Sequence, residues 1–240
     1  MPVYCITGTN RGIGLEFVRQ LAQSAEKYTI LALTRSLSSD LGELKAAAST
    51  TTHILECDTS NLQSIHTFTK GATKILGNQK IDFLLNSAAV NAASWQNSLT
   101  LGPDDLIDQI KTNVLGPAKM VEFLLGTDLL SPNVRILNMT SGLASLQISS
   151  GMSPRKSTGY SISKAALNML SVHQADDLKG KLPGCVVIVM DPGWVKTRMG
   201  GSGATVEPHE TVKSMLGILL KLKEDDNGSF FHYTGEKIPW

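Results

Sequence analysis

The sequence lacks any strong charge bias. Its 240 residues contain 22 lysines and arginines against 21 aspartates and glutamates, which gives a formal net charge of +1. No run of basic residues is longer than two, so neither a nucleic-acid surface nor an electrostatic membrane surface is indicated. We therefore expect no nucleic-acid partner and no membrane partner.

Cysteine is scarce, and long apolar runs are absent. The three cysteines, Cys5, Cys57 and Cys185, all fall in apolar segments that predict strands, and they form neither a CxxC pair nor a cluster with histidine. This pattern predicts no metal site, and an odd number of buried thiols fits a reducing compartment. No apolar run reaches membrane-spanning length, and the first residues predict a strand rather than a signal peptide. We expect a cytoplasmic protein.

The composition is that of a chain with a large core. Apolar residues make up 42% and charged residues 18% of the sequence, and no segment has the composition of a linker. A length of 240 residues lies within the range of one large α/β domain. We therefore expect residues 1–240 to form a single domain.

Short apolar segments rich in Val, Ile and Leu alternate with longer segments of helical period. The predicted strands are 3–8, 29–34, 53–57, 81–86, 134–140, 185–191 and 229–235. The predicted helices are 15–25, 61–77, 104–126, 157–179 and 208–223. Strands that are apolar at nearly every position are typical of a parallel sheet covered on both faces. The alternation predicts the Rossmann fold, a doubly wound, mostly parallel seven-stranded sheet with helices on both faces.

A glycine-rich turn, TGTNRGIG, joins the first predicted strand to the first predicted helix. Gly8, Gly12 and Gly14 have the spacing G-x3-G-x-G, a looser form of the dinucleotide-binding fingerprint. Glycines allow a tight turn and a close approach of a pyrophosphate to the helix N-terminus, where free N–H groups favour negative charge. The alternative is that the glycines only form a turn.

The end of the second predicted strand bears on the choice of dinucleotide. An NAD site usually has an acidic residue there, which binds the ribose 2′-hydroxyl. This chain instead has Thr34 and Arg35, and Arg11 lies within the glycine turn. Two guanidinium groups suit a 2′-phosphate, so we favour NADP(H). The alternative is that both arginines are solvated surface residues.

The stretch YSISK places Tyr160 and Lys164 four residues apart in a predicted helix, on the same face. An ammonium group beside a phenol stabilises the phenolate and lowers the pKa of the tyrosine, which is useful where a proton must move. The alternative is a surface pair that contributes a few tenths of a kcal/mol.

Seven motifs in order resemble the short-chain dehydrogenase/reductase family across the chain. They are TGTNRGIG at 7–14, CD at 57–58, NSAA at 86–89, TNVLG at 112–116, MTSGLAS at 139–145, YSISK at 160–164 and DPGWVKT at 191–197. Within the family, the segments NRGIG, YSISKAALNML, PGWVKT and YTGEKIPW resemble the C-factor and Sniffer-type carbonyl reductases.

The resemblance implies a catalytic set. Tyr160 matches the acid/base, and Lys164 matches the residue that lowers its pKa and binds the nicotinamide ribose. Ser141 matches the serine that orients the substrate carbonyl, and Asn113 the asparagine that holds a proton-relay water. Asp58 matches an adenine contact, while Val195 and Thr197 match carboxamide contacts. The implied cofactor-binding residues are Gly8, Asn10, Arg11, Gly12, Ile13, Gly14, Arg35, Asp58, Thr59, Asn86, Ala88, Tyr160, Lys164, Pro192, Gly193, Val195 and Thr197.

The chain departs from the family pattern in two places. The usual NNAG is NSAA here, so Ser87 and Ala89 replace an asparagine and a glycine near the cofactor. The stretch between Ser141 and Tyr160 is also longer than usual, and we expect its extra residues, 149–158, to form a loop at the substrate mouth. The segments 87–103, 145–159 and 198–209 should shape the pocket, and nothing in them identifies the substrate.

These observations predict an NADPH-dependent oxidoreductase that reduces an aldehyde, ketone or quinone to an alcohol, with Tyr160 as the proton donor. An NAD-dependent alcohol dehydrogenase is one alternative, and a cofactor-binding signalling protein like C-factor is another. The resemblance also implies assembly through the helices at 104–126 and 157–179. The apolar residues of the second helix favour a homodimer.

Overall fold

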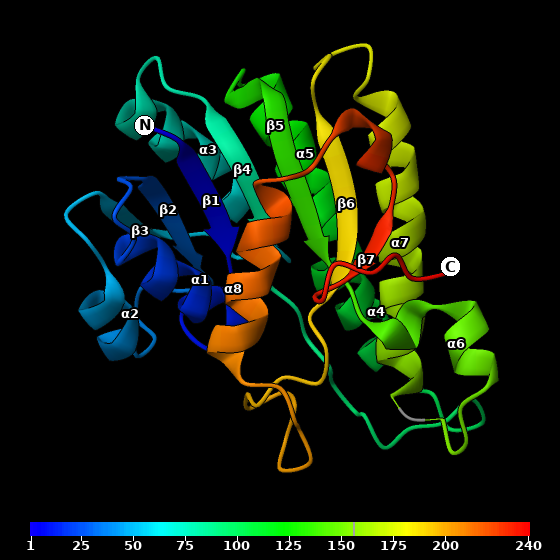
Figure 1. Cartoon of the computed structure of the whole chain (residues 1–240). Coiled ribbons are helices and arrows are strands. Elements are labelled where there is room, and N and C mark those ends of the chain that lie inside the picture. The colour runs from blue at the N-terminus through cyan, green and yellow to red at the C-terminus, as the bar shows by residue number, and fades with distance from the viewer. Residues whose placement is uncertain (156) are drawn as a thin grey trace.

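The computed structural model describes residues 1–155 and 157–240, and its centre is one seven-stranded sheet (Figure 1). All seven strands are parallel and lie in the order β3-β2-β1-β4-β5-β6-β7. The strands are β1 (Val3–Thr7), β2 (Thr29–Thr34), β3 (Thr52–Glu56), β4 (Ile81–Asn86), β5 (Leu130–Met139), β6 (Val186–Asp191) and β7 (Phe230–His232). This confirms the doubly wound Rossmann architecture.

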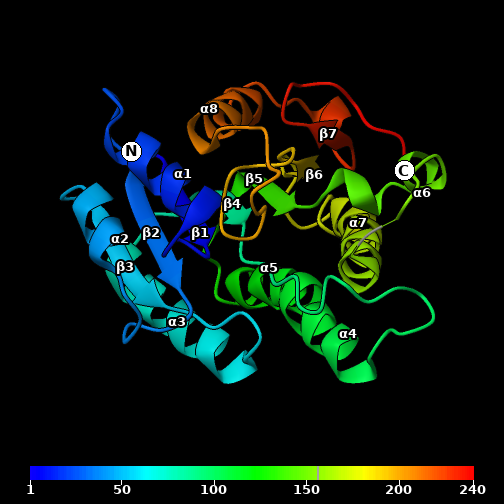
Figure 2. The same ribbon diagram turned by 90° about the horizontal axis from the view of Figure 1, so that it is seen from below.

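Helices cover both faces of the sheet, as Figure 2 shows from below. On one face lie α1 (Gly12–Ala22), α2 (Gly42–Ala47) and α8 (Pro208–Leu219), and on the other lie α3 (Leu62–Leu76), α5 (Gly116–Gly126) and α7 (Thr158–Asp177). Helix α4 (Pro103–Ile110) packs against α7 and continues through a π-helical turn, η1 (Lys111–Leu115), into α5. A short helix α6 (Leu146–Ser150) and 3-10 turns η2 (Gly142–Ala144) and η3 (Glu224–Asp226) complete the described elements.

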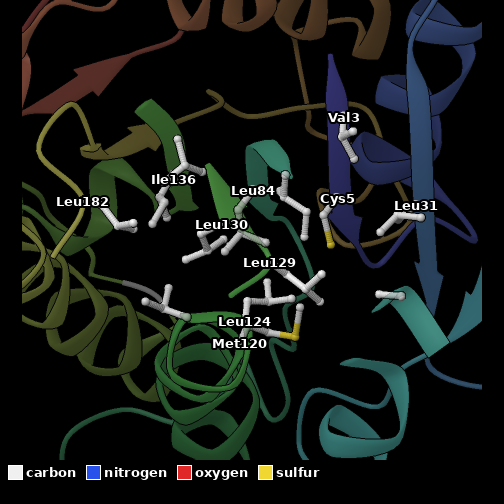
Figure 3. Close-up of a cluster of buried hydrophobic side chains, with 14 of the residues drawn as sticks. Val3, Cys5, Leu31, Leu84, Met120, Leu124, Leu129, Leu130, Ile136 and Leu182 are labelled. Carbon is white, nitrogen blue, oxygen red and sulfur yellow. The ribbon is translucent and has the colours of Figure 1, made fainter. Parts of the chain in front are cut away.

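The hydrophobic core has two parts because the sheet separates the two helical layers. Figure 3 shows the part on the α5 side, where Val3, Cys5 and Leu84 of the sheet face Met120 and Leu124 of α5. The other part joins alternate strand residues to the apolar faces of α1, α2 and α8. Burial on both faces explains why the strand sequences are apolar at nearly every position.

The strand order reverses between β1 and β4, which pair with each other although α1, β2, α2, β3 and α3 separate them in the chain. A doubly wound sheet binds its ligand at the carboxyl ends of the strands next to such a reversal. The glycine turn follows β1, the NSAA motif begins at the last residue of β4, and Ser141 follows β5. The topology therefore gathers the motifs at one edge of the sheet.

Several boundaries differ from those predicted. Strand β5 begins at Leu130 rather than at 134, because a register shift next to Ile81 extends the pairing through the polar segment 131–133. Strand β7 has three residues instead of seven, since the chain turns back at Gly235, whose φ is 96°. Cys57 and Cys185 lie one residue outside their strands, although both are buried.

Two short helices were not predicted. Helix α2 has six residues and α6 has five, too few for a periodic pattern. Helix α6 occupies the start of the stretch 149–158 that we expected to be a loop, and the Ser145 hydroxyl caps it by accepting the N–H of Ile148 at 3.1 Å. Lys156 in that stretch lies outside the described residues. Within the described parts of the chain, no helix combines the length and apolarity needed to cross a membrane.

Candidate active site

The glycines of the turn after β1 are required by close backbone contacts. Gly8 and Gly12 have φ values of 73° and 59°, in the region that favours glycine. A Cβ on Gly8 would lie 2.8 Å from the Cα of Ala88, and one on Gly14 would lie 2.3 Å from the carbonyl oxygen of Gly8. These positions admit no larger residue without movement of the backbone.

The turn leaves the N-terminus of α1 open. Thr9 anchors the turn, because both its backbone N–H and its hydroxyl donate to the carbonyl oxygen of Leu33 at 3.0 Å. Arg11 is the N-cap residue of α1 and makes no side-chain capping bond. The first N–H groups of a helix have no partner within it, so those that begin at Gly12 can bind an anion. This cradle fits a dinucleotide pyrophosphate. Ile13, just inside the helix, packs against the core.

The two arginines proposed for cofactor selection are exposed. Arg35 directly follows β2, and neither it nor Arg11 forms an ion pair with a described carboxylate. Glu56 is the register partner of Thr34 on β3, and its carboxylate accepts the backbone N–H of Leu37 at 2.9 Å. The loop that follows Arg35 therefore holds the Glu56 carboxylate through the N–H of Leu37. Glu56 was not among the predicted site residues.

The residues predicted to contact the adenosine part of the cofactor differ in burial and in the hydrogen bonds that they already make. The Asp58 carboxylate accepts the backbone N–H of Ser60 at 2.9 Å and its hydroxyl at 2.7 Å. Thr59 is buried against Gly116, where a Cβ would lie 3.0 Å from the threonine side chain. The backbone N–H of Ala88 donates to the hydroxyl of Thr7 at 2.9 Å. Asn10 is half-buried within the glycine turn.

The side chain of Asn86 belongs to a buried polar network. Its amide nitrogen donates to the Asn138 side-chain oxygen at 2.8 Å, and the Asn138 amide donates to Ser171 at 2.8 Å and to Gln174 at 2.9 Å. This network ties β4 and β5 to α7. Asn86 was predicted as a cofactor contact, whereas Asn138, Ser171 and Gln174 were not predicted because no local motif marks them.

Tyr160 and Lys164 both lie on α7, as the spacing predicted. The Lys164 side chain is only 1% exposed, and its Nζ lies 5.6 Å from the centre of the Tyr160 ring. The ammonium group donates to the carbonyl oxygen of Met139, at the end of β5, at 2.7 Å. Burial lowers the pKa of Lys164 to about 7.

The electrostatics of Tyr160 differ from the expectation that a neighbouring cation lowers its pKa. Burial is the main cause of a raised pKa of the phenol, and the negative charge of Asp191 raises it further. The hydrogen bond that Lys164 donates goes to the carbonyl oxygen of Met139. The raised pKa favours the protonated form of the Tyr160 phenol.

Ser141 follows β5 and begins the turn η2. Its hydroxyl accepts the N–H of Leu143 at 3.2 Å, which leaves the hydroxyl proton free to be donated. The turn packs against α7, and Thr140 strengthens that contact by donating to the side-chain oxygen of Asn168 at 2.6 Å. Ser141 can therefore offer a fixed hydrogen bond to a carbonyl oxygen on the α7 side.

Asn113 is buried in the π-helical turn η1, a feature often found at functional sites. Its side-chain oxygen accepts the N–H of Val90, and its amide donates to the carbonyl of Val90 and to the hydroxyl of Ser163, all at 2.9 Å. Ser163 in turn donates to the carbonyl oxygen of Tyr160 at 2.8 Å. The sequence analysis missed Ser163, although it lies within the YSISK motif.

The loop after β6 meets the glycine turn. A Cβ on Gly12 would lie 3.4 Å from the methyl group of Thr197, so the two motifs are in contact. Gly193 has a φ of 77° and packs on the ring of Tyr233, since a Cβ on this glycine would lie 2.8 Å from the ring. Pro192 and Val195 are buried and fix the loop. The predicted cofactor motifs at 8–14 and 191–197 therefore share one surface.

Large apolar side chains are exposed on the segments predicted to shape the pocket and close to them. Those on the segments are Trp95, Leu99, Leu146, Met152 and Met199, and Trp194 and Trp240 lie outside them. Backbone bonds join these segments in pairs, from Gln147 to Trp240 at 3.2 Å and from Ser157 to Ser94 at 3.3 Å. Figure 1 shows the chain end beside α6. The Trp194 indole donates instead to the carbonyl of Gly200 at 2.7 Å, so this tryptophan folds onto its own loop.

No group of three or more His, Cys, Asp or Glu residues in the described parts of the chain could hold a metal ion. The candidate site brings together the Ser141 hydroxyl, the Tyr160 phenol, the buried Lys164 ammonium and a glycine-rich anion cradle. This combination suits proton transfer and hydrogen bonding to a carbonyl oxygen next to a bound dinucleotide.

Known proteins with similar sequences and structures agree with this chemistry. The family model for short chain dehydrogenase matches residues 2–206. The C-signal protein of Myxococcus xanthus is 33% identical over 163 residues, which cover 67% of this chain and 93% of that protein. The carbonyl reductase Sniffer of D. melanogaster has a TM-score of 0.91 at 27% identity, and the NADPH-bound carbonyl reductase from chicken fatty liver has a TM-score of 0.92 at 27% identity. Both alignments cover 100% of each chain. The chain belongs to the short-chain dehydrogenase family and is an oxidoreductase.

Proposed function

We propose that the protein reduces a carbonyl compound, an aldehyde, ketone or quinone, to an alcohol with NADPH. The observation that carries the proposal is the position of Tyr160, next to the buried Lys164, at the strand ends where the glycine cradle opens. Two similar structures are named carbonyl reductases, and one of these is titled as bound to NADPH.

The residues present fit a dinucleotide. The open N-terminus of α1 would hold the pyrophosphate, with Arg11 and Arg35 near a 2′-phosphate. The remaining proposed contacts are Asp58 and Thr59 toward the adenine, and Val195 with Thr197 toward the nicotinamide. When bound, the reduced nicotinamide supplies a hydride to the carbonyl carbon.

The residues of the chain supply the proton and hold the oxygen. Tyr160 donates its phenol proton to the oxygen as negative charge develops there. Ser141 donates a hydrogen bond to the same oxygen, which stabilises that charge. Lys164 binds the nicotinamide ribose and returns a proton toward Tyr160. Both amide N–H groups of the Asn113 side chain already donate, to Val90 and to Ser163, so a relay water at Asn113 would donate to its side-chain oxygen or to its backbone carbonyl.

A second candidate is a cofactor-binding signalling role, which the 33% identity to C-signal favours. An NAD-dependent alcohol dehydrogenase is a third. Turnover of a panel of aldehydes, ketones and quinones, with NADPH and with NADH, separates the three. We expect carbonyl reduction with NADPH. Tight NADPH binding without turnover of any carbonyl favours the signalling role, and alcohol oxidation confined to NAD favours the dehydrogenase.

We also propose that the protein forms a homodimer through α7 and the α4–α5 segment. Ile162, Met169 and Val172 on α7 and Ile107 and Leu115 on the neighbouring segment are exposed apolar residues. Sedimentation should show a dimer at micromolar concentration that Met169→Lys weakens. A wild-type chain that sediments only as a monomer contradicts the proposal.

A further inference from the structure

Asp191, the last residue of β6, has a carboxylate that joins two loops of the candidate site. One oxygen accepts the backbone N–H of Gly193 at 3.0 Å. A Cβ on Gly142 would lie 2.9 Å from the other oxygen, so the carboxylate packs against the backbone of Gly142. The carboxylate therefore fits only because residue 142 has no side chain. The sequence analysis placed Asp191 in a motif without giving it a role.

Hydrogen bonding favours the charged form of Asp191. The N–H of Gly193 donates to one oxygen, and an N–H donor stabilises a carboxylate in its ionised form. Burial raises the pKa of Asp191, while the backbone N–H groups of Gly193 and Gly142 and the charge of His232 on β7 oppose that change. Among the described residues, no lysine or arginine forms an ion pair with it.

The negative charge lies beside the place where a substrate carbonyl must sit. Gly142 follows Ser141, and the charge of Asp191 acts on the phenol of Tyr160. Lys164, the cation on α7, is buried and directed at Met139. A substrate oxygen held between Ser141 and Tyr160 is therefore close to a fixed anion that no ion pair with a described residue balances.

We propose that Asp191 is a specificity-determining residue, whose carboxylate makes the enzyme accept neutral carbonyl compounds and reject those that carry a carboxylate next to the carbonyl. The proposal rests on the proposed carbonyl reduction. Two like charges a few ångströms apart in a half-buried site repel strongly enough to change a rate about tenfold or more. A 2-oxo acid should be a poor substrate, and its neutral ester a good one.

The test compares benzoylformate with its methyl ester, a pair that differs at the reacting end mainly in charge. The ratio of kcat/KM for the ester to kcat/KM for the acid is measured in the wild type, in Asp191→Asn and in Glu207→Gln. Glu207 is a matched control because it is an exposed carboxylate near the same loop, paired with Lys196. A ratio cancels any loss of activity common to both substrates.

We expect Asp191→Asn to lower the ester-to-acid ratio about tenfold or more and Glu207→Gln to leave it unchanged. An unchanged ratio in Asp191→Asn overturns the proposal. If the wild type reduces neither compound, the panel of aldehydes, ketones and quinones decides whether carbonyl reduction is the function, and binding decides the role of Asp191. Calorimetry should show that the wild type binds benzamide more tightly than benzoate, and that Asp191→Asn removes this difference in affinity. The same difference in affinity in both proteins overturns the proposal.

Discussion

The polar groups around Tyr160 and Lys164 are buried and hydrogen-bonded to one another, whereas Arg11 and Arg35 extend into solvent without ion pairs to described residues. Ser163 bonds Asn113 to the backbone of Tyr160, and Lys164 is fixed on Met139. The folded chain therefore positions the proposed catalytic groups in advance, while the arginines keep the rotamer freedom that a bound anion would remove. Groups that are already in position favour a fast chemical step. Flexible arginines that bind an anion favour discrimination between ligands with and without that anion.

The largest expected effect comes from the preorganised region. Tyr160→Phe should lower kcat for carbonyl reduction about a hundredfold or more, because it removes the proton donor and keeps the ring. The dissociation constant of NADPH, measured by nicotinamide fluorescence, should change little. A variant that keeps near wild-type turnover on the best carbonyl substrate removes Tyr160 from the mechanism.

A smaller effect is expected from the exposed region. Arg35→Ala should weaken NADPH about tenfold to a hundredfold, since a charge-assisted hydrogen bond contributes roughly 1.5–3 kcal/mol. NADH lacks the 2′-phosphate and should be nearly unaffected. The measurement is kcat/KM for both cofactors in the wild type, Arg11→Ala, Arg35→Ala and the double variant.

Two outcomes would contradict this assignment of the arginines. One is a wild type that prefers NADH, and the other is an equal loss for both cofactors in each variant. Adding an aspartate through Thr34→Asp to Arg35→Ala should move the preference further toward NADH, because the carboxylate accepts the ribose 2′-hydroxyl and repels a phosphate.

Stability should depend on pH through Lys164. Its pKa is lowered from 10.5 to about 7 in the folded chain, so between these values the unfolded chain binds more protons and stability rises with pH. Lys164→Met should therefore stabilise the protein most at pH 7 and below, and its advantage should shrink by roughly ten degrees in Tm toward pH 10.

Lys74→Met, which removes an exposed lysine on α3, is the control and should show no such trend. A difference in Tm between Lys164→Met and the wild type that stays constant from neutral to alkaline pH would show that Lys164 is not held in a desolvated site.

The smallest effect concerns residues 145–155 and 157–159, which we propose lie at the substrate mouth. Their Ser, Gly and Pro content and the short α6 favour local opening, whereas α7 packs along the sheet. Hydrogen exchange in this segment should slow when NADP and a substrate analogue are added, and exchange in the buried part of α7 should not change. Equal exchange of the segment with and without ligands argues against a role as a lid.

The sequence by itself determined the seven strands, the glycine turn and the pairing of Tyr160 with Lys164, because these depend on local periods and spacings. Apolar strands must be covered on both faces, and residues four apart share a helix face, whatever the rest of the chain does. The short α2 and α6, and the π-helical turn at Asn113, carry no such period and were not predicted.

Tertiary structure decided what each polar group touches. Asn138 meets Asn86, Ser171 and Gln174 only because β4, β5 and α7 pack together. Tyr160 has a raised pKa rather than a lowered one, since burial and the charge of Asp191 act on the phenol while Lys164 turns to Met139. Desolvation and charge act through space, between residues that the sequence separates by tens of positions, and only the folded chain fixes those distances.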